Sequence, residues 1–197
     1  MKSAVFSYFP DILRAGPRTL VLGAWCLVLG VLLSSPFVQV QAADRCTAAL
    51  SPALLDFGST TRGALLEHST GSASASFGSR RTSLQVQCAE AMPMTLMLEA
   101  SAANALLYRF SEGTLQVRIL GAQLDGLTVD WVRKGEEGTP NPDTLRPGDR
   151  MMPWRNGTVA AGQRLVLELE LEARVSQEAT QVRDVTRFES RGSFVVN

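Results

Sequence analysis

Few residues in this sequence have side chains suited to catalysis or metal binding, and the most informative are two cysteines, Cys46 and Cys88. Such a pair can ligate a metal, act in redox chemistry or close into a disulfide, depending on the compartment. No Cys-x-x-Cys spacing accompanies it, so nothing favours the redox or metal role. The third cysteine, Cys26, lies in an apolar N-terminal stretch and follows the bulky Trp25. A lipidated cysteine needs a small residue before it, so we expect Cys26 to be a filler of that stretch.

The first forty-two residues have the pattern of a secretory signal peptide. Basic residues, beginning with Lys2, precede an apolar stretch over 20–33, and small residues lead to Ala42. Fourteen apolar residues fall short of the roughly 20 that span a bilayer. We therefore predict cleavage between Ala42 and Ala43 and export of the remaining chain.

Export into an oxidising compartment favours a disulfide between the two remaining cysteines. They allow only one intramolecular pairing, Cys46 with Cys88, at a separation of 42 positions. On the chain-entropy model, closing a loop of this length stabilises the fold by about 4 kcal/mol.

The other candidates for chemistry are a lone histidine and a row of glutamates. No nucleophile motif such as Gly-x-Ser-x-Gly accompanies His68, so we expect a solvated loop residue. A carboxylate pair or a cation site could be built from Glu168, Glu170 and Glu172, but like charges at this spacing favour the solvated face of a strand near a sheet edge. The sequence has no Gly-rich phosphate loop and no metal-ligand cluster. We therefore predict no catalytic residue, no metal, no cofactor and no enzymatic activity.

Size and charge after cleavage indicate one domain, residues 43–197. The leader takes three of 19 basic and one of 19 acidic residues, leaving 155 residues with a formal net charge of −2. That length suffices for one domain with a substantial core. The charge gives no reason to expect nucleic acid as a partner.

Alternating leucines predict a strand over 164–172. Leu165, Leu167, Leu169 and Leu171 recur at every second position, with glutamates between them. A strand gathers such residues on one buried face, whereas a helix would scatter them.

Further short strands follow the same pattern, and turn signals separate them. Alternation over 84–88, 94–98 and 115–119 predicts strands. Tight turns are predicted at Asp125-Gly126 and Asn156-Gly157. Segments 71–79 and 136–150, rich in Gly, Pro, Ser and Asp, are expected to be loops. Together these features predict an all-β fold, an antiparallel sandwich of about seven strands.

The mature chain resembles the pilin subunits of bacterial chaperone–usher fimbriae and the related fimbria-like proteins. The resemblance is carried by the segment from Cys46 to Phe57-Gly58, by Leu84-Gln85-Val86-Gln87-Cys88 and by an ending within a strand, Gly192-Ser193-Phe194-Val195-Val196-Asn197. In that family the first cysteine opens strand A and the second ends strand B.

The resemblance implies an incomplete immunoglobulin-like sandwich. Its missing strand leaves a hydrophobic groove, which donor-strand complementation fills with a segment of a chaperone or another subunit. The residues expected to border this groove share the last strand: Phe188, Gly192, Phe194, Val196 and Asn197. The partners implied are a periplasmic chaperone, an outer-membrane usher, neighbouring pilus subunits and a host or surface receptor. The implied location is the periplasm in transit and then the fimbrium at the cell surface.

Two departures from the family pattern refine this expectation. The next-to-last residue is Val196, where many pilins have an aromatic residue. After cleavage at Ala42, three residues precede Cys46, and at ~3.3 Å each they are too short to act as a donor. A cut near Ser35 would leave a longer donor, but Pro36 argues against it. The chain is thus suited to the pilus tip as a tip subunit or adhesin.

One alternative from another class stays open at this level. The chain could be a free-standing secreted or periplasmic β-sandwich that binds a ligand and joins no fibre. Trp131 and Trp154 could stack on a sugar, although core packing is the commoner role of such residues.

Overall fold

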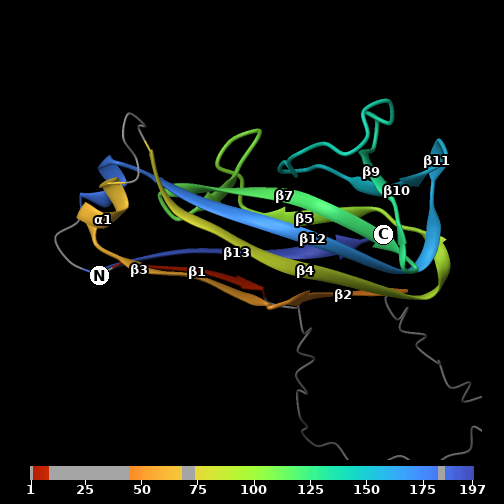
Figure 1. The fold of residues 1–197 in the computed structure, drawn as a ribbon, viewed down its shortest axis with the longest axis horizontal. Helices are drawn as coiled ribbons and strands as arrows, with labels where there is room; N and C mark the ends of the chain where they lie inside the picture. The colour runs from red at the N-terminus through yellow and green to blue at the C-terminus, as the bar shows by residue number, and fades with distance from the viewer. Residues whose placement is uncertain (1, 9–44, 68–73, 182–184) are drawn as a thin grey trace, which may run out of the picture.

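The computed structural model describes residues 2–8, 45–67, 74–181 and 185–197. The described chain is almost entirely β-strand, arranged as two sheets that pack face to face around one hydrophobic core (Figure 1). The all-β, sandwich-like fold expected from the alternation is therefore confirmed. The predicted cleavage site at Ala42 and Ala43 and the histidine at position 68 lie outside the described residues.

The first sheet contains the C-terminal strand and the first strand of the chain. Its order is β11 (Thr158–Val159), β10 (Met151–Arg155), β5 (Leu96–Ala100), β13 (Thr186–Val196), β1 (Lys2–Tyr8) and β3 (Leu54–Thr60), with β9 (Asp130–Arg133) paired to β10.

The second sheet contains the long strands of the molecule. Its order is β2 (Cys46–Ser51), β4 (Ser74–Pro93), β12 (Ala161–Ser176), β7 (Gly113–Leu124) and β6 (Tyr108–Phe110), with β8 (Leu127–Thr128) paired to β7. Helical structure in the described chain is limited to α1 (Arg62–Glu67) and a 3-10 turn, Glu178–Thr180. Neither was expected from the sequence.

Strand β12 confirms the strand predicted from alternating leucines and corrects the expected position of its glutamates. Its inward side chains are all buried: Leu165, Leu167, Leu169, Leu171, Ala173 and Val175. The strand lies at the centre of its sheet, between β4 and β7, and not near an edge. Arginines on the neighbouring strands balance the central glutamate, because Arg81 and Arg118 each lie 3.7 Å from Glu170.

Both predicted tight turns are present, and one predicted loop is wrong. Asp125-Gly126 joins β7 to β8 and Asn156-Gly157 joins β10 to β11, all four residues having positive φ. The segment expected to be a loop over 71–79 is a strand from Ser74 onward, because β4 pairs with β12 along this stretch. Pairing with a long neighbouring strand outweighs the weak strand propensity of Ser and Gly.

The predicted disulfide between Cys46 and Cys88 is present. The two cysteines lie directly opposite each other on the antiparallel strands β2 and β4. The segment from Cys46 to Gly58, which the resemblance implies is strand A, is divided into β2 and β3, which belong to different sheets. The break falls at Pro52, which lacks the N–H group that a continuous ladder needs.

Candidate functional site: the gap between β3 and β13

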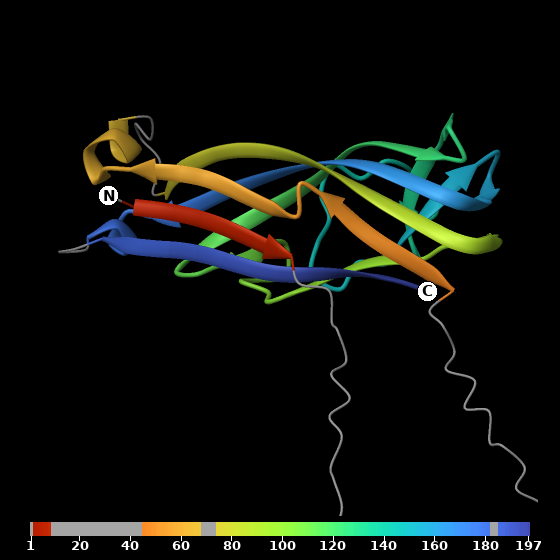
Figure 2. The same cartoon turned by 90° about the horizontal axis from the view of Figure 1, so that it is seen from below.

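Strand β1 occupies a gap between two strands that come from distant parts of the chain. It runs parallel to β13, with Lys2 opposite Thr186 and Tyr8 opposite Gly192. It runs antiparallel to β3, with a register shift between Ala4 and Val5. Figure 2 shows β1 (red) between β3 (orange) and β13 (blue).

The sheet depends on β1 for its continuity at this point. In the described chain, β3 pairs only with β1, and β13 pairs with β5 on its other side. Strands in a sheet are spaced by about 4.8 Å, so β3 and β13 are separated by the width of one strand, roughly 10 Å. Residues 45–197 alone would therefore present two facing strand edges with room for one extended segment between them.

Alternate backbone groups of β13 face the gap and are available to pair with a strand placed there. The N–H and C=O of Asn197 bond to Thr95 at 3.0 and 2.7 Å, and the N–H and C=O of Glu189 bond to Ser111. Backbone groups of successive strand residues point to opposite edges. The even-numbered residues of β13, including Phe188 and Ser190, therefore turn theirs towards β1.

Aromatic side chains form the floor beneath this gap. Phe57 on β3 and Phe188 on β13 are both buried, and each contacts Phe110 of the opposite sheet, with ring centroids 5.8 and 6.4 Å apart. Phe77 joins the cluster at 5.5 Å from Phe188. Loss of the strand above these rings would expose this part of the core to water. Binding of a replacement strand would therefore be favoured by the hydrophobic effect.

The five groove residues expected from the resemblance divide into two groups. Phe188 and Gly192 lie within the register of β1, opposite Ala4 and Tyr8. Phe194, Val196 and Asn197 lie beyond that register, beside β5 and the segment before it. Phe194 pairs with Leu98 and is buried at 7 % exposure in the core.

Gly192 allows β13 to approach β5 closely. A Cβ atom at this position would lie 3.0 Å from the Cβ of Ala100 and 3.1 Å from the carbonyl oxygen of Glu99. Both contacts are tighter than ordinary packing, so a larger residue would separate the two strands.

Two further parts of the gap were not expected from the sequence. The residues of β3, including Leu55 and Phe57, were not expected to border the groove, and the strand over residues 2–8 lies within the predicted leader. Part of a signal was present, because Ala4, Phe6 and Tyr8 recur at every second position, although Val5 breaks the polar alternation between them.

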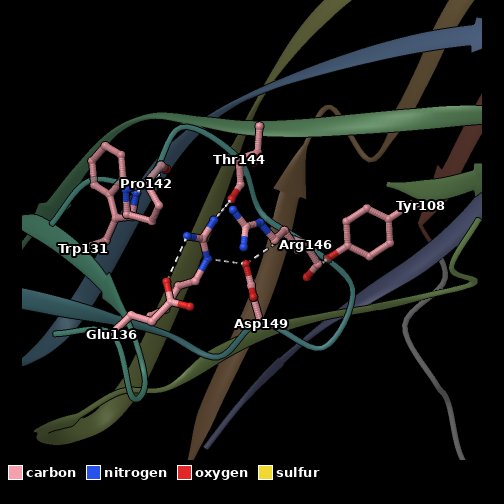
Figure 3. A network of polar contacts seen from close by, with 8 residues as sticks. Tyr108, Trp131, Glu136, Pro142, Thr144, Arg146 and Asp149 are labelled. Carbon is pink, nitrogen blue, oxygen red and sulfur yellow. Dashed lines mark hydrogen bonds and ion pairs between the residues drawn. The ribbon is translucent and has the colours of Figure 1, made fainter. Parts of the chain in front are cut away.

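A buried polar network holds the loop between β9 and β10 (Figure 3). Arg133, only 8 % exposed in its side chain, donates to Asp149 at 2.7 Å and to the carbonyl of Thr144 at 2.5 Å. The same Asp149 oxygen accepts the backbone N–H of Arg146 at 2.9 Å. Arg133 and Asp149 thus satisfy each other's charge inside the protein, which indicates a structural role for this network.

Tyr108 connects the network to β6. Its hydroxyl donates to the carbonyl oxygen of Arg146 at 2.8 Å. Burial, with a smaller contribution from the charge of Asp149, raises the pKa of Tyr108 well above its ordinary value of 10.0. The phenol therefore stays protonated and acts as a hydrogen-bond donor.

Of the two tryptophans considered for sugar stacking, Trp131 is held in place by the loop. Its indole N–H donates to the carbonyl of Pro142 at 3.2 Å (Figure 3), and its ring is half-buried against the core. Trp154 on β10 is also half-buried.

Compared with models of known protein families and with curated proteins, the chain has no match. Across the described residues, no group of three or more His, Cys, Asp or Glu side chains is placed to hold a metal ion. No helix in those same parts of the chain is long and apolar enough to cross a membrane.

Proposed function

We propose that the chain is a non-enzymatic subunit of a chaperone–usher fimbria, which accepts a donor strand in the gap between β3 and β13. One observation carries this proposal: a strand from the predicted leader, Lys2–Tyr8, fills the position between them. If the leader is cleaved at Ala42, the mature domain lacks that strand. A segment supplied by another protein then has to replace it.

The order of events follows from this requirement. A periplasmic chaperone supplies the first donor and keeps the exposed edges from associating with other chains. At the usher, the donor of a neighbouring subunit replaces it. The three residues before Cys46 cannot reach into another subunit's gap, which favours a position at the pilus tip.

A direct test is co-expression of the exported chain with a chaperone encoded beside its gene. We expect a soluble complex of one chaperone with one subunit, and chaperone and usher genes in that neighbourhood. A synthetic peptide of residues 2–8, added in excess, should release the chaperone because it competes for the same position. Absence of such genes, or a mature chain that binds no chaperone, would contradict the proposal.

The alternative is a free-standing binding module, and one observation favours it: the chain closes its own gap when residues 2–8 are retained. Mass spectrometry of the exported protein separates the two functions. We expect an N-terminus at Ala43. Retention of the first eight residues would favour the self-completed module. Full function after His68→Ala would remove the remote possibility of an enzyme that uses this histidine.

A further inference from the structure

A surface hollow lies beside β7, away from the gap between β3 and β13. It measures about 430 Å³ and is formed where the segment after β5 meets the segment before β10. Its lining includes Asn104, Leu106, Leu107, Gln116, Thr144 and Arg146. Sites for small ligands typically begin at roughly 300 Å³, so the hollow has room for a molecule of monosaccharide size.

The structure fixes the backbone of Arg146 and leaves its guanidinium unused. The backbone N–H donates to Asp149 at 2.9 Å and the carbonyl accepts from Tyr108 at 2.8 Å (Figure 3). Its Nε atom is buried without a hydrogen-bond partner, the only such side-chain atom in the described chain. No ion pair among the described residues includes this arginine.

A buried, unsatisfied guanidinium nitrogen is unfavourable unless something accepts its hydrogen bond. Arg133, the last residue of β9, shows the contrast, because it is paired with Asp149 and Glu136. Nε itself is closed to solvent, so a ligand in the hollow would pair with the two terminal guanidinium nitrogens, which make no hydrogen bond or ion pair with the described residues. An anion suits these nitrogens best, since a charged acceptor makes the stronger bond.

The two amides in the hollow also have donors to offer. The Oδ1 atom of Asn104 accepts the backbone N–H groups of Leu106 and Leu107 at 2.8 and 3.0 Å. The Oε1 atom of Gln116 accepts from Arg118 at 3.4 Å. Both oxygens are engaged by groups that can only donate, so the NH₂ group of each amide remains as a donor for a ligand.

Apart from Thr144, the remaining lining is apolar, and it carries no negative charge. Leu106 is 57 % exposed, and its backbone N–H is held by Asn104, so its side chain is available to cover an apolar group of a ligand. No Asp or Glu lines the hollow. The nearest carboxylate on the neighbouring strand, Glu172, is paired with Arg174 at 2.8 Å.

We propose that this hollow binds a carboxylate-bearing ligand of monosaccharide size, with Arg146 pairing its carboxylate, the amides of Asn104 and Gln116 donating to its polar groups and Leu106 covering an apolar substituent. Two sources share this chemistry: an acidic sugar that carries an acyl group, and an acylated amino acid at a peptide end. The proposal does not rest on assembly into a fibre, because the hollow is separate from the gap at β1.

Calorimetric titration of the full chain tests the proposal with three probes. N-acetylneuraminic acid represents the sugar source, N-acetyl-leucine the amino-acid source, and the methyl ester of N-acetylneuraminic acid is the uncharged control. We expect at least one acid to bind with a Kd of about 1 mM or tighter. The ester should bind about tenfold more weakly than its acid, since one charge-assisted bond is lost. Binding of a single acid identifies the source.

The matched variants are Arg146→Gln and Arg155→Gln, which remove the same charge. Arg155 lies exposed on the hairpin of β10 and β11, so its variant should bind like the wild type, whereas Arg146→Gln should lose about tenfold in affinity. If Arg146→Gln does not fold, the acid and ester compared on the wild-type chain decide the question. Equal binding of acid and ester would overturn the proposal. So would the absence of binding by either acid at concentrations up to about 10 times the expected Kd of about 1 mM.

Discussion

Phe188 of β13 stacks on Phe110 of β6, with ring centroids 6.4 Å apart and an interplanar angle of 18°. This contact joins the C-terminal strand to the opposite sheet directly beneath the gap filled by β1. Both rings are fully buried.

Phe188→Ala should therefore destabilise the full chain strongly. Truncation of a buried phenylalanine lowers the free energy of unfolding by about 3–5 kcal/mol. Leu127→Ala is the control, because Leu127 is 58 % exposed and its loss should change stability by no more than about 0.5 kcal/mol. Urea unfolding of both variants measures the difference. A similar small effect at both positions would show that the rings are not part of the core.

Gly192→Ala should separate β13 from β5. The added Cβ atom would lie 3.0 Å from the Cβ of Ala100, and overpacking of this kind lowers stability by about 1–3 kcal/mol. Gly138→Ala is the matched control, since a Cβ atom there meets nothing within 4 Å and the glycine has no positive φ. Equal melting temperatures for the two variants would contradict the close approach of the strands.

Parts of this fold were readable from the sequence because their signals are local. Strand β12 follows from leucines at every second position, and the turn at Asp125-Gly126 follows from residues that tolerate positive φ. The pairing of Cys46 with Cys88 required only the prediction of export. The strand and the turn are encoded by a few neighbouring residues. The disulfide follows because, after export, the two remaining cysteines allow a single pairing.

Other parts depend on contacts between distant segments. β4 begins at Ser74 because it pairs with β12, although its first residues resemble a loop. The strand at residues 2–8 lies within an apolar leader pattern, so its alternation carried little weight. The pairing of Arg133 with Asp149 joins the two ends of a loop, and no local motif announces it.

Asp149→Ala should destabilise the loop between β9 and β10. It would leave Arg133 buried without the carboxylate that lies nearest to it, and breaking a buried pair in this way lowers stability by about 3–5 kcal/mol. Glu136→Gln removes the more distant contact, 3.4 Å from Arg133 at a glutamate that is 55 % exposed, and should change stability by less than about 1 kcal/mol. Thermal unfolding compares them. Equal losses would mean that the loop does not depend on the buried pair.

Stability should fall at alkaline pH because of Tyr108. Its pKa is raised in the folded chain above the ordinary value of 10.0, so above that pH the unfolded chain releases a proton that the folded chain retains. The stabilisation is complete below pH 10 and is lost as pH rises towards the folded pKa, by up to about 1.4 kcal/mol per pH unit.

Tyr108→Phe isolates this effect. The variant lacks the hydrogen bond to Arg146, so at pH 8 it should be less stable than the wild type by about 1 kcal/mol. Between pH 10 and 11.5 the difference should shrink or reverse, because only the wild type has the titrating group. Urea unfolding across this range gives both curves. A constant difference would contradict the raised pKa.

The central claim is that residues 43–197 form a sandwich that lacks one strand between β3 and β13. The most direct measurement follows the association and thermal unfolding of this mature chain with and without a peptide of residues 2–8. Alone, the chain should self-associate, and its melting temperature should be lower than that of the peptide-bound chain. At a hundred times its Kd the peptide should add about 2.7 kcal/mol of stability and yield a monomer. A control peptide with Ala4→Asp and Phe6→Asp should do neither. A mature chain that is monomeric and cooperatively folded alone, and unchanged by the peptide, would contradict the claim.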